Sequence, residues 1–177
     1  LTGIRIVRIA VHPKMQGKGY GYIAIKRLLD FYSSPNIIDP LSKNDEKDKV
    51  IFTMLTEQPH EFVDYASVSF GLTEGLFKFW RKSGFLPVYI AQGRNQITGE
   101  HSIFVLKNLH DEDDDEDDEN NEDKSWLHEF CNEFRKRFGH LLCFDDFDKF
   151  SPKMIDMIFA SIEPKQRFEV DGSFFID

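Results

Sequence analysis

The sequence lacks the features of a membrane or secreted protein. No run of 18 apolar residues is present, and the N-terminus has no basic region followed by an apolar stretch. Only two cysteines, Cys131 and Cys143, occur, without a CxxC pair or a histidine at zinc-ligand spacing. We therefore expect a soluble intracellular chain with two buried free thiols, no membrane partner and no metal.

The apolar residues that are present can build a core. Hydrophobic residues make up 41% of the 177 residues and include 18 phenylalanines, enough for one compact domain with an appendage. The chain begins with Leu1 rather than methionine, and the first expected strand starts almost at once. We therefore expect it to be a fragment of a longer protein.

Negative charge is concentrated in one segment. The net charge is −9, but residues 111–123 hold eleven Asp and Glu and no basic residue. Without those eleven charges the remainder of the chain is mildly basic, at +2, so a nucleic-acid partner is not excluded. Because like charges repel, we expect residues 110–124 to form a disordered acidic loop.

Periodicity and turn residues predict an α/β arrangement. The stretch RIVRIAVHP is rich in β-branched residues up to Pro13, which cannot donate to a sheet. Thr73 can cap a helix that Gly84 ends in a left-handed conformation. The order is strand, helix, strand, helix, strand, strand, and the first strand-helix-strand unit should cross over right-handed. The expected strands are 4–11, 50–55, 65–70, 86–91 and 102–106, the expected helices are 21–32 and 73–83, and the expected inserted loop is 36–49.

The last third of the chain is expected to be helical. An apolar residue recurs every four positions over 126–142, which predicts one face of a long helix. Ser151 followed by Pro152 is typical of a helix start, so a last helix should run to about residue 162. The residues of the long apolar stripe are Trp126, Phe130, Phe134, Phe138 and Leu142, with Leu127, Cys131 and Leu141 beside them.

A glycine-rich turn follows the first expected strand. The sequence QGKGYG places Gly17, Gly19 and Gly21 between a strand and a helix. Backbone N–H groups at such a junction are unpaired, and the helix dipole behind them favours an anion. Without a Cβ, these glycines would let a diphosphate approach the main chain, and Lys18 adds a charge. The loop is neither a Walker A motif nor a GxGxxG fingerprint, and a plain tight turn is the alternative.

A second motif lies about sixty residues downstream, in KFWRKSGF. Together, the Gln-x-x-Gly-x-Gly loop and this segment resemble the GNAT superfamily of acetyl-CoA-dependent acetyltransferases. The resemblance implies an α/β (α+β) GNAT acyl-CoA N-acyltransferase fold, incomplete at its N-terminal strands and with appended C-terminal helices. It divides the chain into a GNAT core over 1–109, the acidic loop 110–124, and a helical region 125–177 that is a candidate RNA-binding or docking tail.

Five sequence blocks extend the resemblance to the RNA cytidine acetyltransferases, helicase-fused enzymes that form N4-acetylcytidine. The blocks are RIVRIAVHP, QGKGYG, DYASVSFGLT, LFKFWRKSGFLPVY and TGEHSIFVLK. The resemblance implies acetyl transfer from acetyl-CoA to cytidine in 18S ribosomal RNA and tRNA, and a role in ribosome biogenesis and tRNA modification. It also implies ribosome-assembly or tRNA adaptor partners and a nucleolar or nuclear location. ATP would bind only to the helicase module, which this sequence lacks.

The resemblance also implies a coenzyme A site at the glycine loop. The end of the first strand would offer its main chain to the pantetheine arm and the thioester carbonyl. Lys82 would face the phosphates of coenzyme A. The implied cofactor-binding residues are Ile9, Ala10, Val11, Gln16, Gly17, Lys18, Gly19, Tyr20, Gly21, Tyr22 and Lys82.

The two usual catalytic groups of the superfamily are absent. Arg5 stands where histone-type members have a glutamate base, and Trp80 stands where many members have a tyrosine acid. Neither a guanidinium nor an indole can take these roles at pH 7. Because the cytosine amine is poorly nucleophilic, a base near neutrality would suit. His101, preceded by Glu100, is the first catalytic candidate and His12 the second, and a purely structural histidine is the alternative.

RNA recognition for base chemistry needs an unpaired or flipped cytosine and cations that hold phosphates. The candidate RNA-binding residues are Arg5, Arg8, Arg81, Arg94, Arg135, Lys136 and Arg137, with solvated faces as the alternative. The last three are expected on the polar face of the long helix, and Phe79 and Trp80 are expected in the core. Two other functions stay open: a GNAT enzyme that acts on a protein lysine or α-amine, and a non-catalytic CoA-binding scaffold in ribosome assembly.

Overall fold

The structure is a computed structural model, and it describes residues 1–34, 60–110, 125–144, 147 and 150–162. Three expected features lie wholly or almost wholly outside these ranges: the insert 36–49, the strand 50–55 and the acidic loop 110–124.

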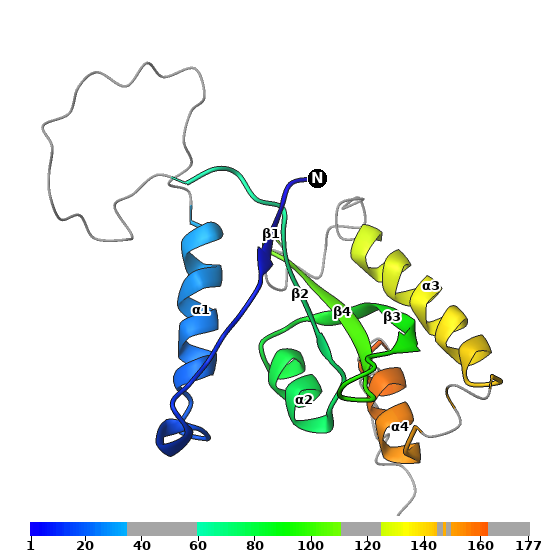
Figure 1. The fold of residues 1–177 in the computed structure, drawn as a ribbon. Helices are drawn as coiled ribbons and strands as arrows, with labels where there is room; N and C mark the ends of the chain where they lie inside the picture. The colour runs from blue at the N-terminus through cyan, green and yellow to red at the C-terminus, as the bar shows by residue number, and fades with distance from the viewer. Residues whose placement is uncertain (35–59, 111–124, 145–146, 148–149, 163–177) are drawn as a thin grey trace, which may run out of the picture.

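Four strands form one sheet in the order β1-β2-β4-β3 (Figure 1). Strand β1 (Gly3–Ile6) is parallel to β2 (Tyr65–Gly71). Strand β4 (His101–Asn108) is antiparallel to both β2 and β3 (Leu86–Arg94). Helix α1 (Tyr20–Tyr32) lies between the two parallel strands in the sequence. The expected α/β arrangement is confirmed, and the order of elements is the predicted one.

The first strand is shorter than predicted. We expected a strand over 4–11, but β1 ends at Ile6 because its pairing with β2 stops where Ile6 faces Val68. Apolar composition fits an extended chain, but strand limits depend on a partner, and the partner is distant in the sequence. Residues 7–11 therefore belong to no strand, and this difference matters for the site.

Helix α2 (Glu74–Lys82) is followed by the predicted left-handed Gly84, which has φ 87°. The Gly84 N–H donates to the Arg81 carbonyl at 3.0 Å. The Phe85 N–H donates to the Trp80 carbonyl at 3.1 Å. This pair of bonds is a Schellman motif, and its apolar contact is made by the Phe85 and Trp80 rings, whose centroids are 5.1 Å apart. The turn fixes the position of the helix that forms one wall of the site.

The C-terminal helices share one core with the sheet. Helix α3 (Ser125–Leu141) packs against β3, and α4 (Pro152–Ala160) lies beside it (Figure 1). Ser151 caps α4 as predicted, since its hydroxyl accepts from the Met154 N–H at 3.2 Å. The largest fully buried side chains include Phe77, Phe85, Ile90, Ile103, Phe138 and Ile158, which come from both parts of the chain.

The buried stripe of α3 differs from the predicted one. A strict four-residue repeat moves 40° around a helix at each step, whereas alternating steps of three and four stay on one face. Phe130, predicted in the stripe, is therefore 58% exposed. The buried residues are Leu127, Cys131, Phe134, Phe138 and Leu141. The prediction that both cysteines are buried is wrong for Cys143, which is exposed beyond the end of α3.

Phe138→Ala is expected to destabilise the chain by about 3–5 kcal/mol. The Phe138 side chain is fully buried, and its ring lies 5.5 Å from Phe159 of α4 and 6.0 Å from Phe150. Urea unfolding measures the loss. Phe130→Ala, on the same helix but exposed, is the control and should cost about 1 kcal/mol or less. A loss of only about 1 kcal/mol or less for Phe138→Ala would contradict the core that the sheet and the C-terminal helices share.

Cys131 is expected to make stability fall above pH 9. Burial raises the pKa of its thiol from 9.0 to about 11, although the Arg81 charge acts in the opposite direction. Between these values the unfolded chain loses the thiol proton while the folded chain keeps it, so stability decreases as pH rises. The expected loss is ~2–3 kcal/mol between pH 9 and 11. Urea unfolding of wild type and Cys131→Ala between pH 9 and 11 measures this loss. A difference in the free energy of unfolding between the two proteins that stays constant over this pH range would contradict the prediction.

Candidate active site

The two parallel strands separate after a short ladder. Pairing ends at Ile6 and Val68, whereas β2 continues to Gly71. Residues 7–11 belong to no strand, and Val7 is 81% exposed. Main-chain N–H and C=O groups that leave a ladder need other partners, which a ligand can supply. The divergence of β1 and β2 therefore opens one side of the site.

A tight loop leads from this segment into α1. It contains a short 3-10 helix, η1 (Pro13–Met15), which His12 caps by accepting the Lys14 N–H on Nδ1 at 3.3 Å. Gln16 Nε2 donates to the Val11 carbonyl oxygen at 3.1 Å and closes the loop. His12, the second candidate base, is thus placed as a cap.

The glycines of the loop form a bare cradle at the start of α1. Gly17 and Gly19 have φ of 75° and 87°, and no atom lies within 4 Å of a Cβ built on either. Gly19 is the N-cap of α1, so the N–H groups of the first turn lie directly after it. Gly21 has another role, because a Cβ there would lie 3.3 Å from the Phe79 ring. The cradle has the chemistry that a diphosphate needs.

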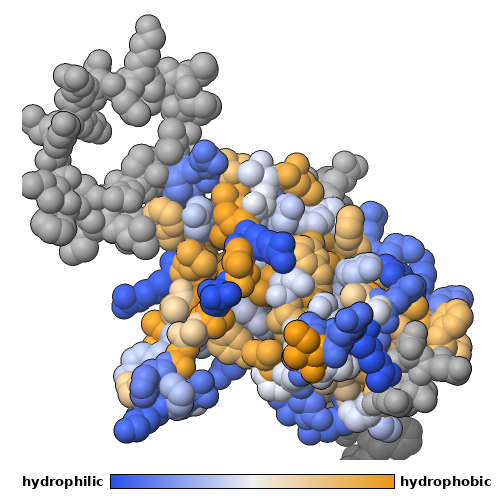
Figure 2. Space-filling view, in the orientation of Figure 1, coloured by the Kyte–Doolittle hydropathy of each residue, from blue (hydrophilic) through white to orange (hydrophobic). Residues whose placement is uncertain are grey.

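A cavity of about 650 Å³ lies between this loop and the start of α2. On the face shown in Figure 2, apolar surface gathers between α1 and α2. The structure brings nine of the eleven predicted cofactor-binding residues to the cavity, and Ala10 and Lys18 are not among its lining residues. The nine are Ile9, Val11, Gln16, Gly17, Gly19, Tyr20, Gly21, Tyr22 and Lys82.

The sequence reasoning missed four lining residues, namely Met15, Gly75, Leu76 and Phe79. Phe79 was expected in the core, but it is half-buried and faces the cavity. The sequence did contain a signal for a second role of α2, because the helix carries apolar residues on more than one face. Its other face packs inward, with Trp80 only 2% exposed, so the expectation of a core residue is confirmed there.

A second cavity, of about 530 Å³, adjoins the first and shares Tyr22 and Lys82 with it. Lys82 Nζ lies 5.6 Å from the centroid of the Tyr22 ring. Lys26 and Lys107 also line this cavity, and Asp30 is the one carboxylate that lines it among the described residues. The surplus of ammonium groups favours an anionic ligand in the second cavity.

His101, the first catalytic candidate, is buried and hydrogen-bonded within the fold. Its side chain is 4% exposed and stacks on Phe147, with centroids 4.5 Å apart. Nδ1 lies 2.9 Å from the Ala91 carbonyl oxygen, and Nε2 lies 3.2 Å from Arg94 Nε. Because an arginine can only donate, Nε2 is the acceptor and Nδ1 carries the proton. The lone pair that a base needs is engaged by Arg94, so a catalytic role for His101 stays a prediction that this geometry does not favour.

Glu100, the other catalytic candidate, lies at the C-terminal end of β2. Its carboxylate covers Gly71, the last residue of β2, so closely that a Cβ at Gly71 would overlap it. The Glu100 side chain is half-buried and lines a third cavity, of about 320 Å³. Gly75, in the first turn of α2, lines the loop cavity four residues after Gly71. Glu100 is therefore a carboxylate at the end of β2, and the cavity that it lines shares no lining residue with the loop cavity.

The predicted RNA-binding residues do not form one surface. Arg5 and Arg8 are exposed on and just after β1. Arg81 is half-buried and donates to the Phe85 carbonyl at 3.0 Å, and Arg94 contacts His101. Their proposed role in RNA binding stays a prediction.

The three basic residues of α3 diverge, so the expectation of a shared face is wrong. Consecutive helical residues are about 100° apart, which places the first and third nearly opposite each other. The Arg135 guanidinium lies 5.9 Å from the Phe159 ring of α4. The Arg137 guanidinium lies 4.5 Å from the Tyr89 ring of β3. Lys136 pairs with Glu133 at 2.7 Å.

Neither a candidate metal centre nor a candidate membrane span occurs among the described residues. In these ranges, no cluster of three or more His, Cys, Asp or Glu side chains could hold a metal ion. No helix among the described residues has the length and apolar character needed to cross a membrane.

Sequence comparisons relate the chain to known acetyltransferases. A family model described as GNAT acetyltransferase 2 matches residues 1–50 and 36–110. The chain is 40% identical to an RNA cytidine acetyltransferase of Mus musculus, with 87% of this chain and 17% of the relative covered. It is 38% identical to that of Saccharomyces cerevisiae, with 85% and 16% covered. It is 34% identical to that of Achlya ambisexualis, with 82% and 44% covered. The chain thus spans less than half of each of these relatives.

The GNAT acetyltransferase domain implies an acyl-CoA substrate. Because the family model matches more than half of the sequence, the chain belongs to the GNAT acetyltransferase 2 family.

Proposed function

We propose that the chain binds acetyl-CoA in the loop cavity and transfers the acetyl group to the N4 amine of cytidine in RNA. The observation that carries the proposal is the cavity at which the diverging segment 7–11, the glycine cradle and α2 meet. The choice of RNA as the acceptor in this reaction is suggested by the name of the relatives, RNA cytidine acetyltransferase. Ribosomal RNA and tRNA as substrates, and a nucleolar location, belong to the proposal and rest on resemblance alone.

The phosphates of coenzyme A fit two neighbouring places. The N–H groups at the start of α1, with Gly17 and Gly19 left-handed, suit the diphosphate. Lys82 stands where the two cavities meet, and Lys26 and Lys107 lie in the second one. We assign these lysines to the 3′-phosphate, because it is the remaining dianion of the molecule.

The uncharged arm of coenzyme A fits the other wall of the loop cavity. Ile9 and Val11 lie on the segment that leaves the ladder, and Leu76 and Phe79 face them from α2. Apolar side chains can cover the methyl groups of pantetheine, while main-chain groups of residues 7–11 bond its amides. The arm would thus run between diverging strands toward β2.

The transfer requires few groups from the protein. The cytidine nitrogen attacks the thioester carbon, the C–S bond breaks, the thiolate leaves, and the nitrogen gives up a proton. A main-chain N–H of segment 7–11 can donate to the carbonyl oxygen as its negative charge grows. We assign the proton to Glu100, whose carboxylate lies over Gly71 at the end of β2, and a supporting role to His101, which contacts Ala91 and Arg94 of β3.

Labelled acetyl-CoA tests the proposal directly. The chain is incubated with single-stranded RNA, with a lysine peptide and with an α-amine peptide, and the products are digested and identified. Label in N4-acetylcytidine is the expected result, and the same RNA with every cytidine replaced by uridine is the control. Label in peptide alone would show a protein acetyltransferase instead. Coenzyme A binding without any transfer would show a scaffold.

A further inference from the structure

The second cavity, of about 530 Å³, lies between α1 and the C-terminal end of α2. It adjoins the loop cavity through Tyr22 and Lys82, which line both. Its volume is within the range of about 300–1,000 Å³ that is usual for small-molecule sites. A ligand whose diphosphate lies at the glycine cradle can therefore extend into the second cavity, and the groups that line this cavity decide which part of a ligand fits there.

The floor of the second cavity is apolar. Ile25 and Leu29, one turn apart on α1, are 3% and 7% exposed, and Leu109, just after β4, is 7% exposed. Side chains that form hydrogen bonds also line the cavity, among them Asp30 and Ser33. An apolar surface with polar groups around it fits a planar heterocycle, because the faces of such a ring are apolar and its edge carries donors and acceptors.

Three ammonium groups line the same cavity. Lys107 Nζ would lie 2.8 Å from a Cβ at Gly84, so the glycine that follows α2 leaves room for this ammonium. Lys82 is in the last turn of α2, two residues before that glycine, and Lys26 is on α1. Three cations in one cavity favour an anion with more than one charge, such as a phosphomonoester.

The carboxylate of Asp30 is the group that a phosphate alone does not explain. It would repel a phosphate, yet it lines the cavity four residues after Lys26 on α1. In the described part of the chain, no ion pair joins it to any of the three lysines. An ionised carboxylate only accepts hydrogen bonds, so its partner in a ligand must be a donor. The exocyclic amine of adenine is such a donor, and it belongs to the nucleoside that carries the 3′-phosphate of coenzyme A.

We propose that the second cavity binds the adenosine 3′-phosphate end of coenzyme A and that Asp30 makes this cavity specific for adenine. The base covers the apolar floor, its amine donates to Asp30, and the 3′-phosphate lies among the three lysines. The inference rests on the proposed function, because it takes the diphosphate to lie at the glycine cradle. An acyl group on a phosphopantetheine arm without adenosine would then be a poor donor for this chain.

Calorimetry with three ligands tests the two contacts separately. The ligands are coenzyme A, dephospho-coenzyme A, and coenzyme A in which adenine has been deaminated to hypoxanthine. Wild type should bind the dephospho form about 3- to 10-fold more weakly than coenzyme A, because the lysines lose their anion. It should bind the deaminated form about 5- to 20-fold more weakly, because a carbonyl oxygen then faces the Asp30 carboxylate.

Two variants assign these preferences to residues. Asp30→Ala should bind coenzyme A and the deaminated form with affinities within about twofold of each other. The two ligands carry the same charge, so any effect of Asp30 on the phosphates cancels in this comparison. Lys107→Gln should bind coenzyme A about 3- to 10-fold more weakly than wild type does, but the dephospho form within about twofold of wild type. Circular dichroism checks that each variant is folded.

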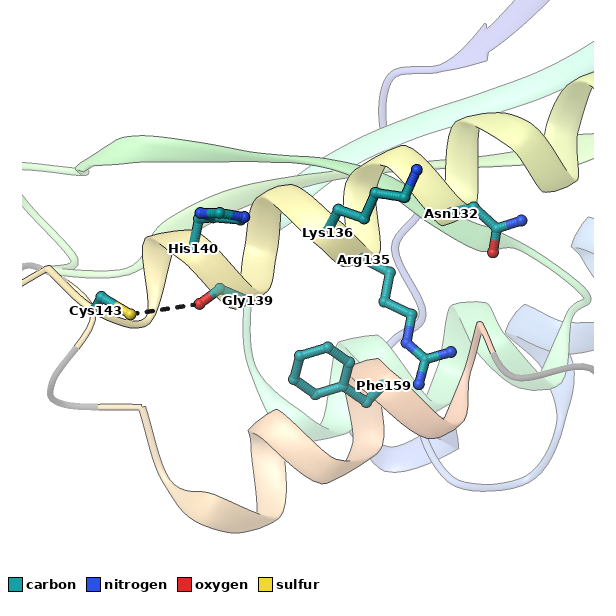
Figure 3. Close-up of a pocket in the computed structure, with 7 residues that line it drawn as sticks. All are labelled: Asn132, Arg135, Lys136, Gly139, His140, Cys143 and Phe159. Carbon is teal, nitrogen blue, oxygen red and sulfur yellow. Dashed lines mark hydrogen bonds between the residues drawn. The ribbon is translucent and has the colours of Figure 1, made fainter.

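Lys78→Gln and Lys136→Gln are the matched controls. Lys78 is exposed on α2, the helix that carries Lys82, but lines neither cavity. Lys136 lines a groove of about 700 Å³ between α3 and α4 (Figure 3), which shares no lining residue with the second cavity. Each control removes one positive charge and should leave the preferences for adenine and for the 3′-phosphate as they are in wild type.

The outcomes separate this inference from the proposed function. Equal affinities of wild type for the three ligands, or a preference for adenine that persists in Asp30→Ala, would overturn the inference and leave the acetyl-CoA site in place. A loss of the 3′-phosphate preference in Lys78→Gln as large as that in Lys107→Gln would overturn it as well, since it would show a general effect of charge. The absence of binding by all three ligands would overturn both proposals together.

Discussion

Gly19→Asp is expected to weaken coenzyme A binding about 30- to 1,000-fold more than Gly19→Asn does. Asp and Asn have the same shape, and both tolerate the left-handed backbone that Gly19 adopts at φ 87°. Both are also good N-cap residues, so α1 should keep its start. The two variants differ only in a negative charge, which would lie roughly 6 Å from the diphosphate, where repulsion by two charges is about 2–4 kcal/mol at an intermediate effective dielectric.

Isothermal calorimetry with coenzyme A measures this difference. Gly139→Ala is a control for glycine replacement as such, because it lies in α3 with open space around its Cα. It should leave the affinity unchanged and increase helix stability slightly. Raising the salt concentration should narrow the gap between Asp and Asn, since exposed charges are screened. Equal affinities of the two variants for coenzyme A at low salt would show that the diphosphate does not bind at the loop.

The cradle could be predicted from the sequence because its chemistry is local. Glycines at alternate positions between a strand and a helix determine the turn, and the helix that follows supplies the N–H groups within a few residues. The same is true of the end of α2, where Gly84 and Phe85 form the predicted turn. In both places the backbone conformation follows from neighbours in the chain.

The remaining features of the site depend on contacts between distant residues. The early end of β1 is set by β2, some sixty residues away. The surroundings of His101 are made by Arg94 and by Phe147, which no local pattern connects. The separation of Arg135 from Arg137 follows from helix geometry alone and could have been predicted. What each of them faces, however, depends on α4 and β3.

Helix α2 has two roles that explain its composition. One face packs Phe77 and Trp80 into the core, and another presents Leu76 and Phe79 to the loop cavity. Its first turn is connected to α4 by the pair between Glu74 and Lys153, at 2.6 Å. The hydrogen bond to Lys153 lowers the pKa of Glu74. Helix α2 therefore belongs to the core and to the wall of the loop cavity at the same time.

Glu100→Gln is expected to slow acetyl transfer to cytidine about 10²- to 10⁴-fold, with coenzyme A affinity unchanged. Glutamine keeps the shape of the side chain over Gly71 but cannot accept a proton. Gly71→Ala gives an independent test, because its methyl group would displace the Glu100 carboxylate without altering its chemistry. It should also slow the transfer, and circular dichroism should show an intact fold.

His101→Asn distinguishes the base from the residue that supports it. Asparagine can still donate to the Ala91 carbonyl but loses the contacts with Arg94 and Phe147, so a loss of stability is expected. If Glu100 is the base, the folded fraction of His101→Asn keeps most of its rate and the pH profile of wild type. Glu100→Gln should instead lose about 10²- to 10⁴-fold in rate while it stays folded. The opposite pattern would be a near-normal rate in Glu100→Gln and a rate reduced by orders of magnitude in folded His101→Asn. That result would identify His101 as the base.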